Sequence, residues 1–327
     1  MKIGIDLGTT NSAAARYEPD RAKAEIILIA GEPLMRSAVA LYRDELLIGT
    51  EAIHNAVRSP KDTIVSVKRL MGRDFADPQI ALVRDRFNYE VVPGTGGDPR
   101  VYVRLGGEMR SPTQISALIL ENIKNEAGKT LGGDVTHAVI TVPAYFTESQ
   151  RAATREAGEL AGLTVMRIID EPTAAAVALG IEIGEDEHQR VLVFDMGGGT
   201  FDISILQTVR DQQGRVQHQG LQIEGDNWLG GDDFDFRIVD WIVDWMRSEH
   251  GTDAAGDSRF HWLAKDYAEQ AKRALSVRTS KDIVIPSAFK LEDGAPVDIE
   301  LTLTRDKFGD DQILRQDGHG PRAQVSG

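Results

Sequence analysis

The chain has no cysteine among its 327 residues. This absence excludes disulfide bonds, thiolate metal sites and a cysteine nucleophile, and it fits a reducing compartment. No apolar run is long enough for a signal peptide or a membrane-spanning helix, and the first residues already have the pattern of a strand. We therefore expect a cytoplasmic protein without a membrane partner.

Positive charge is also scarce. Lys and Arg together number 37 against 51 Asp and Glu, which gives a formal net charge of −14. This balance argues against a nucleic acid or an anionic membrane surface as a partner bound by general electrostatics. A polyanionic ligand would have to be held locally, by backbone N–H groups, a few basic side chains and a metal ion.

Two stretches of the chain have the same organisation. In residues 2–16 an apolar strand ends at Asp6, and Gly8 and hydroxyl residues follow; in residues 191–206 a second strand ends at Asp195 before three glycines and a threonine. The alternation after each turn predicts two hairpins with tips of nearly bare backbone. Because glycine has no Cβ, peptide N–H groups at such a tip can approach an anion, and phosphate is the natural ligand.

We interpret the two hairpins as a clamp that grips a polyphosphate from both sides. Asp6 and Asp195 would then flank a hydrated Mg²⁺, which keeps its waters and needs only one or two carboxylates. The alternative, that each aspartate only caps its own turn, stays open at this point.

The rest of the chain alternates strands with amphipathic helices, which predicts an α/β fold of two lobes with a ligand cleft between them. Helices should follow the capping-box sequences at Ser111 and Thr147. Helical spacing of apolar residues also extends over 234–246 and 260–277. Residues 309–327 have few apolar side chains and no periodicity, so we expect a disordered tail there.

Several charged residues have an ordinary interpretation from the sequence alone. Lys68 lies among other surface charges, and Glu171 precedes Pro172, where a negative charge favours a helix N-terminus. A solvated set of ion pairs is the default interpretation of one further helix face. That face carries Glu269, Lys272, Arg273 and Ser276.

Seven segments, in order along the chain, resemble the seventy-kilodalton heat-shock chaperone family of the DnaK type. The resemblance covers about residues 1–308 and its motifs are highly specific. The segments are Asp6–Ser12, Val67–Gly72, Val142–Phe146, Glu171–Ala176, Phe194–Asp202, Leu229–Asp235 and Glu269–Arg273.

The resemblance implies the actin-like ATPase fold, with a nucleotide between two lobes. Residues 1–170 would form the first lobe (subdomains I), and residues 171–308 the second (subdomains II), incomplete at its C-terminus. Lys68 would reach the γ-phosphate and Glu171 would help to orient the attacking water. Such a site works mainly by positioning and charge neutralisation.

The resemblance also assigns the ligands ATP or ADP, Mg²⁺ and a monovalent cation such as K⁺. Catalytic residues would be Lys68, Glu171, Asp195 and Thr200; metal-binding residues would be Asp6, Asp195 and, for the monovalent cation, Asp202. The nucleotide would contact Gly8, Thr9, Thr10, Asn11, Gly197, Gly198, Gly199, Thr200 and Gly230, with adenosine against Glu269, Lys272, Arg273 and Ser276.

The chain also departs from the family pattern. Family ATPase domains continue beyond this length and are followed by an interdomain linker, a β substrate-binding domain and a helical lid, so we expect a truncated chain that binds no peptide client alone. Partners by resemblance are a J-domain co-chaperone and a nucleotide-exchange factor. The truncation leaves ATPase activity open; the alternatives are a non-enzymatic nucleotide-binding remnant and a small-molecule kinase of the actin-like superfamily.

Overall fold

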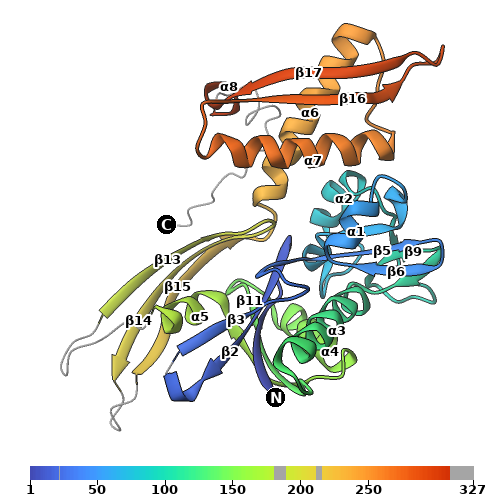
Figure 1. Cartoon of the computed structure of the whole chain (residues 1–327). Coiled ribbons are helices and arrows are strands. Elements are labelled where there is room, and N and C mark those ends of the chain that lie inside the picture. The colour runs from blue at the N-terminus through green and yellow to red at the C-terminus, as the bar shows by residue number, and fades with distance from the viewer. Residues whose placement is uncertain (22, 180–188, 211–215, 310–327) are drawn as a thin grey trace. The chain divides into compact units, whose positions relative to one another are not determined.

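A computed structural model describes residues 1–21, 23–179, 189–210 and 216–309 of the chain (Figure 1). The chain divides into two compact units, Met1–Gly230 and Gly231–Gly327, and each is described by itself. Of the disordered tail expected over residues 309–327, only Gly309 is described, and it ends a short helix. The boundary expected at residue 170 separates the two lobes of an actin-like fold, not these two compact units, and it stays a prediction.

The largest sheet of the first unit has the order β12-β11-β1-β2-β3, with β4 paired to β2. Strands β1, β11 and β12 are parallel, so their carboxyl ends meet at one edge, where Asp6 pairs with Thr141 and Val142 pairs with Asp170. Residues at or just after these ends are thereby brought together. The bounds are β1 Lys2–Asp6, β2 Asn11–Glu18, β3 Lys23–Ile27, β4 Met35–Arg36, β11 His137–Val142 and β12 Thr164–Asp170.

Two helices, α3 (Pro112–Leu131) and α4 (Glu148–Leu160), pack against each other beside this sheet (Figure 1). Both begin at the predicted capping boxes, where the Ser111 and Thr147 side chains accept hydrogen bonds from the backbone of the third helical residue. Buried Ile115 on α3 and Ile140 on β11 belong to one apolar core, which fixes the helices on the sheet.

Short elements complete this part of the first unit. Two small antiparallel sheets have the orders β6-β5-β7 and β10-β9-β8. Their strands are β5 Ala38–Tyr42, β6 Glu45–Ile48, β7 Thr63–Val65, β8 Val91–Pro93, β9 Val101–Leu105 and β10 Glu108–Arg110; the helical segments are α1 Thr50–Asn55, α2 Pro78–Val83 and the 3₁₀ turns η1 Pro19–Arg21, η2 Pro60–Asp62, η3 Val67–Leu70 and η4 Arg84–Arg86.

The second predicted hairpin belongs to a three-stranded antiparallel sheet of β13 (Gln189–Met196), β14 (Phe201–Arg210) and β15 (Val216–Asp226). Helix α5 (Glu171–Ala178) contacts β13 and β14 (Figure 1). The inward side chains of β14 are buried, whereas Leu192 and Phe194 on β13 are 65% and 64% exposed. One face of this sheet is therefore apolar and open to solvent.

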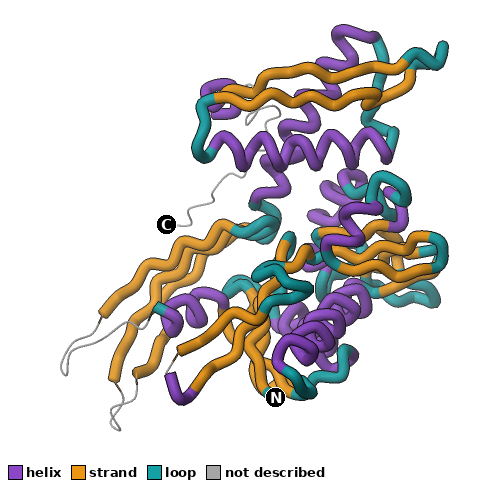
Figure 2. Tube along the Cα trace, in the orientation of Figure 1, coloured by secondary structure: helices purple, strands orange, loops and turns teal. Residues whose placement is uncertain are grey.

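The second unit is built from α6 (Gly231–His250), α7 (Ser258–Leu275), the hairpin β16–β17 (Ser280–Lys290 and Pro296–Thr304) and α8 (Arg305–Gly309) (Figure 2). Its own core contains Ile242, Phe260 and Ile299, each 0–1% exposed. The helical spacing of apolar residues thus predicted both long helices correctly.

The structure is of the predicted α/β class. Within the described ranges, no helix is both long enough and apolar enough to cross a membrane. The cytoplasmic location stays a prediction.

Candidate functional site

The two glycine-tipped hairpins meet within the first unit. A Cβ atom placed on Gly198 would overlap the Thr10 side chain, and one on Gly199 would lie 2.5 Å from Thr9 Cγ2. The tip of the β13–β14 hairpin therefore lies directly against the tip of the β1–β2 hairpin. This contact confirms that the hairpins face each other, and it explains why the second tip requires glycine.

Two other glycines shape the same region. A Cβ on Gly8 would overlap the carbonyl oxygen of Asn11, so the first turn is as tight as the sequence pattern indicated. A Cβ on Gly230 would lie 2.5 Å from the backbone nitrogen of Gly199 and 2.6 Å from the carbonyl oxygen of Gly198. The loop after β15 therefore packs against the second tip, and the contact of Gly230 with the nucleotide stays a prediction.

The sheet edge brings charged side chains to the hairpins. Asp6 ends β1, Glu171 follows β12 directly, and Asp195 pairs with Asp202 in the register of β13 and β14. Lys68, from η3, places its Nζ 2.8 Å from Glu171 Oε1. These two side chains are only 7% and 16% exposed, so the pair is a buried ion pair rather than a surface one.

The charged form of three carboxylates in this cluster is disfavoured, so their pKa values are raised. Burial raises the pKa of Glu171, the nearby Lys68 ammonium opposes the rise, and the charge of Asp6 adds to it. Burial and then Asp6 raise the pKa of Asp195. Burial, Glu171 and Asp195 raise the pKa of Asp202 to about 7. The cluster therefore holds more negative charge than Lys68 balances, and a cation would relieve the repulsion.

The residues present fit a hydrated Mg²⁺ better than a metal enclosed by protein ligands. Among the described residues, no three His, Asp or Glu side chains are grouped as a metal site. Asp6 Oδ1 accepts a hydrogen bond from Thr141 Oγ1 at 3.0 Å, which orients the carboxylate. Within the same described part of the chain, Asp202 Oδ1 is buried without a hydrogen-bond partner. Hydrated Mg²⁺ needs only one or two such carboxylates.

Threonine hydroxyls line the contact between the hairpins. Thr9 and Thr200 are 5% and 9% exposed. Thr10 Oγ1 is buried and has no hydrogen-bond partner in the described ranges, although a buried hydroxyl normally finds one. An orphaned hydroxyl beside glycine backbone is suited to donate to a phosphate oxygen.

Of the four residues predicted to contact adenosine, Glu269, Lys272 and Arg273 lie on α7 of the second unit, and Ser276 follows its last residue. There Lys272 Nζ donates to the Gly231 carbonyl at 2.7 Å and pairs with Asp235 Oδ1 at 2.6 Å, while Arg273 lies 3.8 Å from Glu269. Ser276 is exposed at the end of the helix. The contribution of this face to a nucleotide site stays a prediction.

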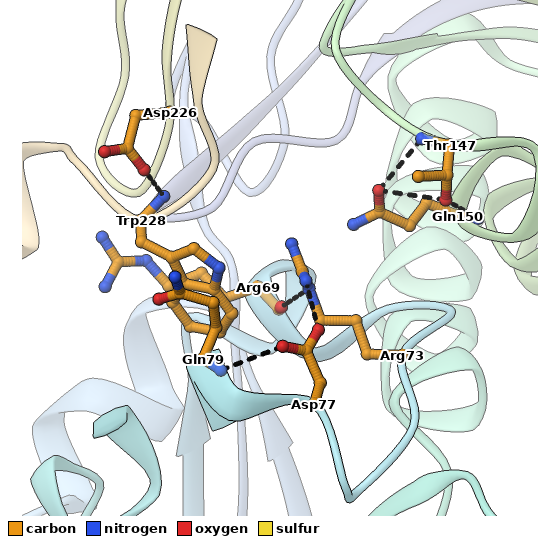
Figure 3. A network of polar contacts seen from close by, with 8 residues as sticks. All are labelled: Arg69, Arg73, Asp77, Gln79, Thr147, Gln150, Asp226 and Trp228. Carbon is orange, nitrogen blue, oxygen red and sulfur yellow. Dashed lines mark hydrogen bonds and ion pairs between the residues drawn. The ribbon is translucent and has the colours of Figure 1, made fainter. Parts of the chain in front are cut away.

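Sequence reasoning missed two residues of the first unit that border the hairpins. Arg69 is 3% exposed, and its Nε would lie 2.6 Å from a Cβ on Gly199. The Trp228 ring lies 5.9 Å from the Arg69 guanidinium and 4.8 Å from that of Arg73 (Figure 3). A tryptophan two residues before Gly230 was the available signal, but a long-range partner cannot be identified from it alone.

The chain is similar to known proteins over most of its length. Residues 2–315 match the family model described as "Hsp70 protein". The chaperone protein DnaK of Burkholderia cenocepacia is 41% identical over 307 residues, which covers 94% of this chain and 46% of that protein. The chain thus spans about half the length of this curated relative.

Proposed function

The chain belongs to the Hsp70 family, with its actin-like ATPase fold, and on this premise we propose that it binds ATP or ADP with Mg²⁺ and hydrolyses ATP. The observation that carries the proposal is the contact between the Gly198–Gly199 tip and Thr9–Thr10, beside a carboxylate cluster that contains a buried lysine. Backbone N–H groups, hydroxyls and an ammonium group are the donors that a polyphosphate requires.

Phosphate binding would use both tips. The Thr10 hydroxyl and the backbone of Gly198 and Gly199 would donate to phosphate oxygens. The other residues of the two tips and the following loop would also contact the nucleotide; they are Gly8, Thr9, Asn11, Gly197, Thr200 and Gly230. Since the hairpins are already packed together, little reorganisation would accompany binding.

Asp6 and Asp195 would hold Mg²⁺ through its water shell, and the ion would neutralise charge on the phosphates. Burial and mutual repulsion raise the pKa of Asp195, which supports a cation at this place. Asp202, buried and partly unpaired, would hold a monovalent cation such as K⁺.

Lys68 and Glu171 would divide the catalytic work. The Lys68 ammonium bonded to Glu171 in this structure would turn to the γ-phosphate, which leaves the carboxylate as acceptor for the attacking water. Positioned charge of this kind stabilises a phosphoryl-transfer transition state, in which charge spreads over the phosphate oxygens.

The family also supports two partner classes. We propose a J-domain co-chaperone and a nucleotide-exchange factor as partners of this chain, on the ground of its membership in the Hsp70 family.

Calorimetric titration with Mg-ATP, followed by single-turnover hydrolysis, tests the proposal. We expect saturable binding and slow hydrolysis without any acceptor, and Glu171→Ala should slow hydrolysis at least about 100-fold because it removes the acceptor for the water. Glu159→Ala, at an exposed position on α4, is the matched control and should keep the normal rate.

Other outcomes would favour the alternatives. ADP formation that depends on an added sugar would indicate a small-molecule kinase. Binding without turnover, or neither, would indicate a non-enzymatic remnant and refute ATP hydrolysis by this chain.

A further inference from the structure

The loop between β15 and α6 touches the candidate site at both of its ends. At its start, the Trp228 backbone N–H donates to Asp226 Oδ1 at 2.8 Å, which fixes the turn that leaves β15. At its end, Gly230 packs on the backbone of Gly198 and Gly199. The loop is therefore short and anchored, and the Trp228 side chain has a defined place between the anchors.

The indole of Trp228 contacts the segment that carries Lys68. The guanidinium groups of Arg73 and Arg69 lie 4.8 and 5.9 Å from the ring, within the range of cation–π attraction (Figure 3). Arg69 directly follows Lys68 on η3, and Trp228 also packs against the apolar core of the first unit. The cation–π attraction between the Trp228 ring and the two guanidinium groups restrains the side chains of Arg69 and Arg73.

Arg73 extends this contact. Its Nε donates to the Arg69 carbonyl at 3.1 Å, and its terminal nitrogen donates to Asp77 Oδ2 at 2.6 Å. The Arg73 and Asp77 side chains are only 14% and 23% exposed. Trp228, Arg69, Arg73 and Asp77 thus form one connected, partly buried group that lies between the second hairpin and the Lys68 segment.

The polar atoms of the loop indicate that the ring face matters more than the indole N–H. In the described part of the chain, neither Trp228 Nε1 nor Asn227 Oδ1 has a hydrogen-bond partner, although both are buried. A cavity of about 580 Å³, lined in part by Arg73, Asp77, Tyr145 and Asn227, lies on this side of the loop. A buried donor without a partner lowers stability, so the indole N–H does not account for a tryptophan at this position.

We infer that Trp228 is a positioning residue for the ATPase site: its ring holds Arg69 and Arg73, and through them Lys68, against the glycine tip of the second hairpin. The inference rests on the proposed function, because Lys68 must act at the phosphate for its position to matter. Binding of a nucleotide, which the hairpins would do, depends less on the ring than hydrolysis does.

The test uses the full chain with Trp228 replaced by Ala, Leu or Phe. Trp228→Ala should lower the single-turnover rate at saturating Mg-ATP about 10- to 100-fold, because small displacements of catalytic groups have effects of this size. The Mg-ATP dissociation constant should change less than about threefold. Trp228→Phe keeps an aromatic face and should restore most of the rate; Trp228→Leu keeps apolar volume without that face and should not.

Trp241→Ala is the matched control, since the Trp241 ring also has a lysine over it, Lys307 at 4.2 Å, but lies in the second unit on α6. Its rate should equal that of the unchanged chain. The other tryptophans, Trp241, Trp245 and Trp262, belong to the second unit, so the fluorescence difference between the unchanged chain and Trp228→Phe isolates Trp228. This difference should change saturably with Mg-ATP.

The outcomes separate the two proposals. If the unchanged chain does not hydrolyse ATP, the proposed function fails, and this inference fails with it. Two other outcomes overturn the positioning inference alone, because they show that the role of Trp228 is only structural. In the first, the unchanged chain hydrolyses ATP, but Trp228→Leu and Trp228→Phe have the same single-turnover rate. In the second, Trp228→Ala loses thermal stability and Mg-ATP affinity as much as it loses rate.

Discussion

The three glycines at the tip of the second hairpin have different surroundings. A Cβ on Gly197 would have its nearest neighbour, the Thr200 carbonyl oxygen, at 3.5 Å, which is an ordinary contact. A Cβ on Gly198 would overlap Thr10, and on Gly199 it would press on Thr9 and Arg69. The hairpin itself thus tolerates a side chain at the first glycine, whereas the contact between the two hairpins excludes one at the second and third.

Gly198→Ala should therefore separate the tips and weaken Mg-ATP binding about tenfold or more, because the phosphate donors no longer converge. Gly256→Ala is the control, because a Cβ at this exposed position meets nothing within 4 Å, and it should bind normally. Calorimetric titration of both variants gives the comparison. Equal affinities for the two variants would show that the contact of the hairpins does not form the phosphate site.

Lys68 is a second residue with unusual surroundings, because it is a buried charge. Lys68 is 6% exposed, which is rare for a lysine, and its ion pair with Glu171 joins residues that are 103 positions apart. The sequence showed Lys68 and Glu171 as ordinary charges with ordinary explanations. Their roles came from the family resemblance, and their proximity came from the fold.

Among the elements, α6 and α7 are joined by two ion pairs as well as by apolar contacts. Asp232 and Lys265 lie 2.9 Å apart, and Asp235 and Lys272 lie 2.6 Å apart. Burial raises the pKa of Asp235 to about 6, although Lys272 and Lys265 oppose the rise. The desolvation of this carboxylate therefore outweighs its attraction to the lysines.

This raised pKa predicts the pH dependence of the α6–α7 contact. Between the unfolded pKa of 3.8 and the folded pKa of about 6, the folded state holds more protons, so the contribution of Asp235 to the free energy of unfolding is full below pH 4 and is lost as the pH rises through 6. Asp235→Asn cannot titrate. The free energy of unfolding of the Asp235→Asn variant, minus that of the unchanged chain, should therefore increase by about 1–3 kcal/mol from pH 4 to pH 7.

Urea unfolding at several pH values, followed by fluorescence of the second-unit tryptophans, measures this difference. Glu292→Gln, at an exposed turn position, is the control and should give a difference that does not vary with pH. A pH-independent difference for Asp235→Asn as well would contradict the raised pKa.

The starts of elements that are marked by neighbouring residues in the sequence could be predicted. The capping boxes at Ser111 and Thr147 give the starts of α3 and α4, because the capping hydrogen bonds join residues three positions apart. The extent of β16, Ser280–Lys290, in contrast depends on its pairing with β17. Pairing across a sheet is not a local property, so its extent could not be read from one strand.

At the scale of the molecule, each compact unit has an apolar core of its own. Ile140 in the first core and Ile242 in the second are both 0% exposed, and no residue is common to the two clusters. Separate cores of this kind favour unfolding in two steps rather than in one. The open apolar face on β13 belongs to the first unit, and exposed apolar surface of this kind favours association or aggregation.

Calorimetric unfolding of Ile140→Ala and Ile242→Ala tests the two-step expectation. Each change should cost about 2–5 kcal/mol, because it leaves a cavity in one core. Each variant should lower the midpoint temperature of a different transition. For each kcal/mol lost, the midpoint of the smaller second unit should fall by more degrees. Val277→Ala, at a position 83% exposed, should leave both transitions in place. A single transition that both core variants lower equally would show that the units unfold together.

The sequence by itself determined the local features of this protein: strands that end in Asp6 and Asp195, glycine-tipped turns, helix starts and the motifs that carry the family resemblance. These features depend on neighbours along the chain, so periodicity, turn chemistry and motif spacing reveal them. Only the tertiary structure decided that Gly198 lies on Thr10, that Lys68 reaches Glu171, and that Trp228 lies beside two arginines. Such contacts come from sheet order and packing between distant segments, which no local pattern specifies.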